Sequence, residues 1–256
     1  MKSIFLAAIT CLFSLNVSGA VVTREITYKI DTTAFRGFLA YDDAIKAKRP
    51  GILVVHEWWG LNDFTKSKAK DLAALGFVAF AADMYGNGIT TTDPKMAGTL
   101  AGGVRGTPKM RQRVKAAFDE LLSLPQVDAA RTAAIGFCFG GTAALELAYS
   151  GAPVKAIVTF HGGLFPATAV DLRNIKAKIL VLHGADDPTM KPEAISQFQD
   201  ALRSAHADWQ MVYFGNSVHA FTNPANGADN SKGMAYNPLS AERSWKYMRD
   251  FFAEVL

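Results

Sequence analysis

Residues 136–141 read Gly-Phe-Cys-Phe-Gly-Gly and place a thiol between two glycines, each two positions away from it. They follow an apolar run at 132–135 and precede a helical pattern at 142–148. This order predicts a strand, a sharp turn with Cys138 at its apex, and a helix. A nucleophile elbow has this form because its central residue is strained and bulky flanking residues would collide with the adjacent strand and helix. The pattern favours a nucleophilic Cys138, and the alternative is a tight turn around a buried, inert cysteine.

A nucleophilic thiol needs a base to take its proton and an acidic group to orient that base. Residues 183–188 read His-Gly-Ala-Asp-Asp-Pro, and residues 217–221 read Ser-Val-His-Ala-Phe. In α/β-hydrolases the chain order is nucleophile, acid, histidine, and the same order occurs here. An imidazole takes the thiol proton and returns it to the leaving group, while a carboxylate holds the ring. The spacing favours Asp187 over Asp186, so we expect a triad of Cys138, His219 and Asp187.

Acyl transfer also needs hydrogen-bond donors for the oxyanion that forms during the reaction. In this fold they come from the backbone N–H after the nucleophile and from the first strand-to-helix loop, which indicates Phe139 and Trp58. The His-Gly-Gly segment at 161–163 lies downstream of the nucleophile and is interpreted as structural, as are His56 and His183 at strand ends. The five histidines are scattered, with no pair at metal-ligand spacing, so we expect no metal and no other cofactor.

The elements that must position these residues alternate between apolar strands and helical patterns. Predicted strands cover 25–30, 35–41, 52–55, 77–82, a segment ending at 135, 154–160, 179–182 and 209–213. Predicted helices cover 64–75, 94–100, 110–122, 142–149, 193–205 and 241–252. The first two strands alternate like an antiparallel hairpin, and the later ones are continuous apolar runs typical of buried parallel strands. We therefore expect one domain at 21–256 with an α/β-hydrolase fold: a mainly parallel sheet, helices on both faces and an N-terminal antiparallel hairpin.

Composition and the N-terminus limit partners and location. The formal net charge is only +4, and no Lys/Arg block is interleaved with aromatic residues, which argues against nucleic-acid binding. Residues 1–20 combine Lys2, an apolar run and small residues up to Ala20, the pattern of a cleaved secretory signal peptide and not of a stable membrane anchor. We expect a periplasmic or secreted mature protein. Because Cys11 leaves with the signal, Cys138 would be its only thiol.

Four segments together resemble the dienelactone hydrolase family. They are His-Glu-Trp-Trp-Gly-Leu at 56–61, Ala-Asp-Met-Tyr-Gly at 82–86, the elbow, and Val-His-Ala-Phe at 218–221. The resemblance spans most of the mature chain and implies hydrolysis of a small ester or lactone through a thioester on the cysteine. It also implies that Glu57 lies against the thiol and helps govern release of the thiolate. From the residues alone, the alternative for Glu57 is a helix-start carboxylate stabilised by the helix dipole, and the active-site role is favoured over it.

Within these segments we place Trp59, Tyr85 and Phe221 in the substrate pocket. The family holds a substrate carboxylate with two arginines, one shortly after its Asp-x-Tyr segment and one shortly after its His-x-Phe segment. Those regions here read Gly-Asn-Gly at 86–88 and Thr-Asn-Pro at 222–224. This departure favours a neutral ester or lactone.

Other interpretations stay open. Arg105 is an alternative carboxylate clamp; it lies in the variable segment 84–107, which is hard to predict and could cover an active site. An acyltransferase on the same fold is compatible with the residues. A non-catalytic ligand-binding protein is disfavoured because such a protein has no need of an intact triad. The sequence does not indicate an oligomeric state.

Overall fold

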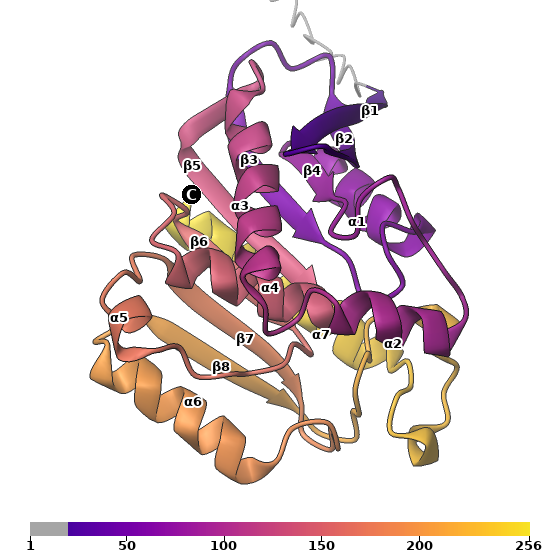
Figure 1. Cartoon of the computed structure of the whole chain (residues 1–256), viewed down its shortest axis with the longest axis vertical. Coiled ribbons are helices and arrows are strands. Elements are labelled where there is room, and N and C mark those ends of the chain that lie inside the picture. Colours follow the sequence, from indigo (N-terminus) through magenta and orange to yellow (C-terminus); the bar gives the residue numbers. More distant parts are fainter. Residues whose placement is uncertain (1–19) are drawn as a thin grey trace, which may run out of the picture.

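The computed structural model describes residues 20–256, in which eight strands form one sheet (Figure 1). The predicted signal peptide lies outside the described residues except for Ala20, and it stays a prediction. The strands are β1 (Val21–Ile30), β2 (Thr33–Asp42), β3 (Arg49–Val55), β4 (Val78–Ala82), β5 (Val127–Phe137), β6 (Ala156–Phe160), β7 (Lys178–Gly184) and β8 (Trp209–Phe214). The helices are α1 (Asp63–Ala74), α2 (Pro94–Gly102), α3 (Pro108–Ser123), α4 (Phe139–Tyr149), α5 (Ala169–Leu172), α6 (Pro192–Ser204) and α7 (Pro238–Val255), with short 3-10 turns η1 (Pro224–Asn226) and η2 (Asn230–Lys232).

The strand order is β1-β2-β4-β3-β5-β6-β7-β8. β2 pairs antiparallel with both β1 and β4, and every pair from β4 across to β8 is parallel. The expected N-terminal antiparallel hairpin and mainly parallel sheet are therefore confirmed. In an open parallel sheet, ligands bind beyond the carboxyl ends of the strands, so the residues that follow β3 and β5 to β8 define where to look for a site.

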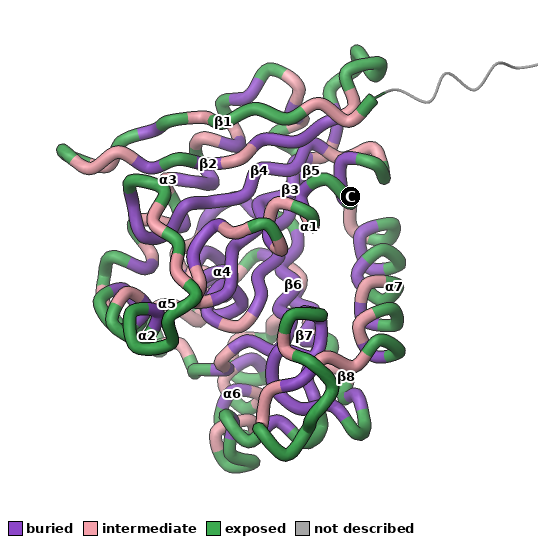
Figure 2. The backbone as a smooth tube through the Cα atoms, turned by 90° about the vertical axis from the view of Figure 1, so that its right-hand side faces the viewer, coloured by how far each residue is buried: buried purple, intermediate pink, exposed green. Residues whose placement is uncertain are grey.

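The sheet separates two apolar cores, because strand residues alternate between its faces. In β3, Leu53 and Val55 belong to the core that also contains residues of α3, α4 and α6, while Ile52 and Val54 belong to the core that contains residues of α1 and α7. Figure 2 shows the result, with buried strands at the centre and exposed segments on the outer sides of the helices. Burial on both faces explains why the central strands read as continuous apolar runs and not as alternating ones.

Five helices, α1, α3, α4, α6 and α7, begin earlier in the chain than the apolar spacing predicts, and three of these starts are prolines. α3, α6 and α7 start at Pro108, Pro192 and Pro238, where the fixed proline φ suits the first helical position. At α7, the Asn237 side chain accepts the N–H of Ser240, which satisfies one donor of the first turn. The short α5 was not predicted, since four residues carry no periodic signal. No helix within residues 20–256 is long and apolar enough to cross a membrane.

Candidate active site

The turn between β5 and α4 puts Cys138 in a backbone conformation that few residues adopt, with φ of 51° and ψ of −114°. Such a conformation costs roughly 1–3 kcal/mol and persists only when its surroundings hold it. The flanking glycines make it possible. A Cβ on Gly136 would lie 1.9 Å from the carbonyl oxygen of Gly140, and a Cβ on Gly140 would lie 2.2 Å from that of Val55. The strand, turn and helix predicted around Cys138 are therefore present, with the turn exposing the thiol at the C-terminal edge of the sheet.

Asp187 and His219 meet at the same edge, in the loops that follow β7 and β8. Nδ1 of His219 lies 2.8 Å from Oδ2 of Asp187. The other carboxylate oxygen, Oδ1, accepts hydrogen bonds from the backbone N–H and the hydroxyl of Thr189, at 2.8 and 2.6 Å. Both oxygens of the buried Asp187 are thus satisfied, which fixes the plane of the carboxylate and, through it, the imidazole.

The charges at this site favour an ionised Asp187 and a protonated His219. Burial alone would raise the pKa of Asp187, but hydrogen bonds and charge from His219, together with Thr189, lower it to about 2. Burial alone would lower the pKa of His219, but the charge of Cys138 and the bonds to Asp187 and Cys138 outweigh it and raise that pKa to about 10. His219 is therefore bonded to the Asp187 carboxylate and lies within the electrostatic influence of Cys138, with which it shares a cavity.

Cys138 and His219 open into a cavity of about 360 Å³. Its lining is mostly apolar and contains two cationic residues, Arg105 and Lys232, but no aspartate or glutamate. The complete lining is Trp58, Arg105, Cys138, Thr142, Gly163, Phe165, Pro188, Thr189, Met190, His219, Lys232, Gly233 and Met234. A half-buried thiol and an imidazole thus line one mostly apolar cavity.

The three aromatic residues predicted to line the pocket lie behind this lining. Tyr85 is buried and its hydroxyl donates a 2.8 Å hydrogen bond to the carbonyl of Trp58. Trp59 packs its ring on that of Trp58, with centroids 4.8 Å apart, and Phe221 is fully buried. It is Trp58, one residue before Trp59, that reaches the cavity. The backbone conformation of this loop decides which of the two adjacent tryptophans faces the cavity, and the sequence alone does not show which side chain does so.

The residues predicted to donate to an oxyanion flank the thiol. Phe139 begins α4, so its backbone N–H belongs to the first helical turn, whose donors have no partner within the helix. The loop that carries Trp58 is held in place by hydrogen bonds to both ring nitrogens of His56. Nε2 of the buried His56 accepts the N–H of Met84 at 3.1 Å, which leaves the ring proton on Nδ1 to donate to the carbonyl of Glu57. His56 therefore anchors this loop to the segment after β4, as the sequence indicates for a strand-end residue.

Glu57 is buried beside the triad, with a partner that sequence analysis missed. Its Oε2 accepts a 2.6 Å hydrogen bond from the side-chain amide of Asn223. Burial raises the pKa of Glu57 to about 7, and the Asn223 bond and the charge of His219 lower it only in part. The hydrogen bond of the Glu57 side chain runs to Asn223, and His219 acts on Glu57 through its charge. Direct contact between Glu57 and the thiol stays a prediction.

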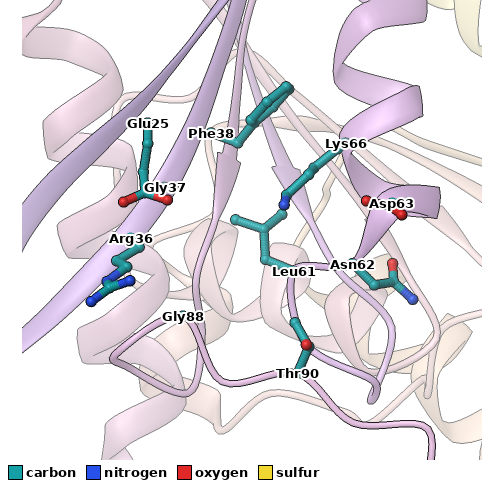
Figure 3. A pocket seen from close by; sticks show the side chains of 10 residues that line it. All are labelled: Glu25, Arg36, Gly37, Phe38, Leu61, Asn62, Asp63, Lys66, Gly88 and Thr90. Atoms are coloured by element: carbon teal, nitrogen blue, oxygen red, sulfur yellow. The ribbon is translucent and has the colours of Figure 1, made fainter.

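A second hollow, of about 280 Å³, lies between the β1–β2 hairpin and the start of α1 (Figure 3). It is lined by Glu25, Arg36, Gly37, Phe38, Leu61, Asn62, Asp63, Lys66, Gly88 and Thr90. Its charged residues are of both signs, and it contains neither a thiol nor an imidazole, so it lacks the chemistry of the first cavity. Within residues 20–256 no three His, Cys, Asp or Glu side chains gather in the arrangement of a metal site.

Comparison with known proteins agrees with this geometry. The model of the dienelactone hydrolase family matches residues 35–256. The chain belongs to the dienelactone hydrolase family. The solved structure of a protein named m3DLH is 45% identical, with a TM-score of 0.90 over 93% of this chain and 100% of that one. A dienelactone hydrolase-like promiscuous phosphotriesterase from metagenomic libraries is 43% identical, with a TM-score of 0.88 over 93% and 99% of the two chains.

Among curated sequences, a Saccharolobus solfataricus protein provisionally named as a carboxymethylenebutenolidase is 27% identical over 91% of this chain and 98% of its own length. The predicted family and α/β-hydrolase fold are thus confirmed. Within this member of the dienelactone hydrolase family, the structure brings Cys138, His219 and Asp187 together and sets Glu57 next to them. The sequence carried no signal for Asn223 beyond its place in a segment where arginine was expected, because an isolated loop asparagine does not reveal its partner.

Proposed function

We propose that this dienelactone hydrolase family member hydrolyses small carboxylic esters or lactones, with Cys138 as nucleophile, His219 as base and Asp187 as the group that orients the base. The observation that carries the proposal is that Cys138 and His219 line one cavity, and that Nδ1 of His219 lies 2.8 Å from the Asp187 carboxylate. This is the minimum arrangement that produces a thiolate next to a protonated base.

In the proposed reaction, the thiolate of Cys138 attacks the ester carbonyl, and the oxyanion that forms accepts the backbone N–H groups of Phe139 and Trp58. As the carbon–oxygen bond breaks, protonated His219 gives its proton to the leaving alcohol, and a thioester remains on the sulfur. His219 then takes a proton from a water molecule, which attacks the thioester and releases the acid. Asp187 keeps Nδ1 protonated throughout, so that Nε2 is the nitrogen that exchanges protons.

Glu57 is the proposed modulator of the thiol. Its raised pKa, to about 7, means that its charge changes near neutral pH inside a buried site. An ionised Glu57 adds negative charge near the thiolate, and a protonated one does not. Its titration therefore alters the balance between thiol and thiolate, which matches the role that family resemblance implies.

The residues that line the cavity indicate a class of substrate and not one particular compound. Its apolar lining suits a compact hydrophobic acyl or alcohol group. Arginine is absent at 86–88 and 222–224, which favours a neutral ester or lactone, while Arg105 and Lys232 supply positive charge from other positions in the lining. The predicted signal peptide supports a periplasmic or secreted site of action.

Phosphotriester hydrolysis is a second candidate activity. A structural relative that is 43% identical is titled a promiscuous phosphotriesterase. A neutral triester matches the apolar cavity of this chain, and the proposed thiolate and N–H donors suit a developing negative oxygen on phosphorus as well as on carbon. We propose this as a side activity of the same site.

The test is a substrate screen with wild type and Cys138→Ala. The panel contains a neutral p-nitrophenyl ester, an anionic ester of the same length, a lactone and a neutral phosphotriester. Turnover of at least one carboxylic substrate that is lost in Cys138→Ala supports the proposal, provided that circular dichroism shows an intact fold. Undiminished turnover in Cys138→Ala contradicts it. Product analysis with added alcohols separates a hydrolase, which releases the acid, from an acyltransferase, which yields a new ester.

A further inference from the structure

His161 follows β6 and lies behind the backbone of the nucleophile. Its ring is fully buried, and Nδ1 accepts the N–H of Cys138 at 3.2 Å. The same N–H also lies 3.0 Å from the carbonyl of Phe160. On the opposite side of the ring, Nε2 lies 2.8 Å from the hydroxyl of Thr222. One imidazole therefore contacts both the nucleophile elbow and the loop after β8.

The hydrogen bonds fix the tautomer of His161. A backbone N–H can only donate, so Nδ1 has no proton, and the proton of the neutral ring is on Nε2, from which it is donated to Thr222. Burial, together with the charge of His219, lowers the pKa of His161 well below its ordinary value, so the ring stays neutral. With both nitrogens engaged, His161 has no free atom that could take the thiol proton, and its role differs from that of His219.

The loop that His161 contacts is the one that carries the base. Thr222 comes three residues after His219, and the rings of His161 and His219 pack edge to face with centroids 5.4 Å apart. Phe221, which lies between His219 and Thr222 in the sequence, also packs on His161, with ring centroids 5.3 Å apart. The elbow and the loop that carries His219 are therefore both hydrogen-bonded to the same buried ring, although Cys138 follows β5 and Thr222 follows β8.

We propose that His161 is a positioning residue that sets the alignment of the Cys138 sulfur with the His219 imidazole, by holding the elbow through Nδ1 and the base loop through Nε2. The inference deepens the proposed function and rests on it. Alignment matters because a displacement of about 1 Å between reacting groups can lower a rate by about a hundredfold. Neither bond touches the substrate cavity, so the effect is on the rate of acylation and not on substrate binding.

The sharpest test uses the hydroxyl of Thr222, which can be removed with little change in volume. Thr222→Val deletes the acceptor of the Nε2 proton, and Thr222→Ser keeps it. We expect Thr222→Val to lower the acylation rate, measured from the burst of p-nitrophenol, by about tenfold with KM nearly unchanged, and Thr222→Ser to restore it to within about threefold of wild type. Equal losses in the two variants would show that the hydroxyl is not what matters and would overturn the proposal.

Two substitutions of His161 separate its nitrogens. His161→Asn places an amide oxygen where Nδ1 lies, and His161→Gln places an amide N–H where Nε2 lies. Each keeps one half of the bridge, so both should acylate more slowly than wild type but faster than His161→Phe, which keeps neither. Thermal unfolding of all variants is measured in parallel, because a purely structural role would lower stability while leaving the acylation rate of the folded enzyme unchanged, which would overturn the proposal.

Cys138→Ala in the same assay distinguishes two failures. If Cys138→Ala retains turnover, the proposed function itself is wrong. If Cys138→Ala is inactive while Thr222→Val and the His161 variants acylate at the rate of wild type, the proposed function stands and the positioning role of His161 is refuted.

Discussion

Asn223 and Glu57 are 166 positions apart in the chain and are joined by a 2.6 Å hydrogen bond from the asparagine amide to the glutamate carboxyl. Both side chains are buried, and the amide oxygen of Asn223 is itself held by the N–H of Ala225 at 3.0 Å. The donor is neutral, and it lies in the segment where the family carries an arginine that this sequence lacks. The charge of Glu57 is therefore set by burial, one amide and the nearby His219, without a direct cation partner.

Removing the side-chain amide of Asn223 should raise the pKa of Glu57. Burial raises the pKa of Glu57 to about 7 against the opposing effect of the Asn223 bond, so Asn223→Leu should raise it further. A hydrogen bond to a charged group is worth about 1.5–3 kcal/mol, which corresponds to about 1–2 pH units. Infrared titration of the carboxyl band, assigned with Glu57→Gln, measures the midpoint. Asn226→Leu is the control, because Asn226 bonds the carbonyl of Ala220 in the same loop and not Glu57. An unchanged or lower midpoint in Asn223→Leu would be contrary to this prediction.

Glu57→Gln should stabilise the protein at neutral and alkaline pH but not in acid. In the folded protein burial raises the pKa of Glu57 to about 7, above the ordinary glutamate value of 4.5. Between these values the unfolded chain has lost a proton that the folded protein retains, so rising pH favours unfolding until Glu57 is ionised in both states. Above the folded pKa the full difference, about 3 kcal/mol, is the penalty that Glu57→Gln removes.

Urea unfolding at about pH 4 and about pH 8 tests this, since the gain in unfolding free energy should be near zero in acid and largest at the higher pH. Glu242→Gln, an exposed position on α7, is the control and should show no such trend. A gain that is independent of pH would mean that Glu57 does not titrate as described.

Asp187→Asn should lower kcat/KM by about a thousandfold or more, because an asparagine cannot hold the tautomer of His219 that the reaction needs. Asp186→Asn is the matched neighbour. Asp186 is exposed, while both carboxylate oxygens of Asp187 are bonded within the site, so Asp186→Asn should stay within about twofold of wild type. Ester turnover decides the matter, and similar losses in the two variants would argue that the acid has been assigned to the wrong aspartate.

His219→Asn should suppress the reactivity of Cys138 in mildly acidic solution. Burial lowers the pKa of His219, but the charge of Cys138 and the bond to Asp187 raise it to about 10, so the proposed thiolate would lie beside an imidazolium. Without the imidazolium the thiolate is disfavoured, so alkylation by iodoacetamide at about pH 6 should be at least about tenfold slower than in wild type. His206→Asn, which changes an exposed histidine, should alkylate like wild type. If His219→Asn alkylated as fast as wild type, the ion pair would be ruled out.

Much of this molecule follows from local signals in the sequence. The apolar runs of the buried strands, the glycines of the elbow and the order of Cys138, Asp187 and His219 are each legible within a few residues. They predict the sheet, its antiparallel hairpin and the edge at which the three groups meet, because parallel strands deliver their carboxyl ends to one side. The proline starts of α3, α6 and α7 were missed, since a proline at the first helical position adds nothing to the apolar period, whereas the start of α2 at Pro94 was predicted.

The hydrogen bonds that hold the site residues in place could not be predicted from local sequence signals. Asn223 on Glu57, Thr222 on His161 and Tyr85 on the carbonyl of Trp58 are hydrogen bonds between segments far apart in the chain. Each depends on side-chain direction in loops, where no period of 2 or 3.6 residues constrains which residue faces inward. Tyr85 was expected at the substrate and instead fastens the loop that carries Trp58.

Arg105 should select for charge in the substrate, since its side chain lines the cavity, and its guanidinium carbon lies 5.8 Å from the ring centroid of Phe139, next to the nucleophile. No acidic residue lines that cavity to offset it. Exposed charge pairs contribute up to about 1 kcal/mol, so Arg105→Gln should lower kcat/KM for an anionic ester by about fivefold and leave a neutral ester of equal length within about twofold. Arg249→Gln, on the outer face of α7, serves as the control and should alter neither value. The ratio of the two kcat/KM values, compared at low and high salt, is the readout, because screening weakens an exposed charge contact. A ratio that Arg105→Gln leaves unchanged would show that this arginine does not contact the substrate.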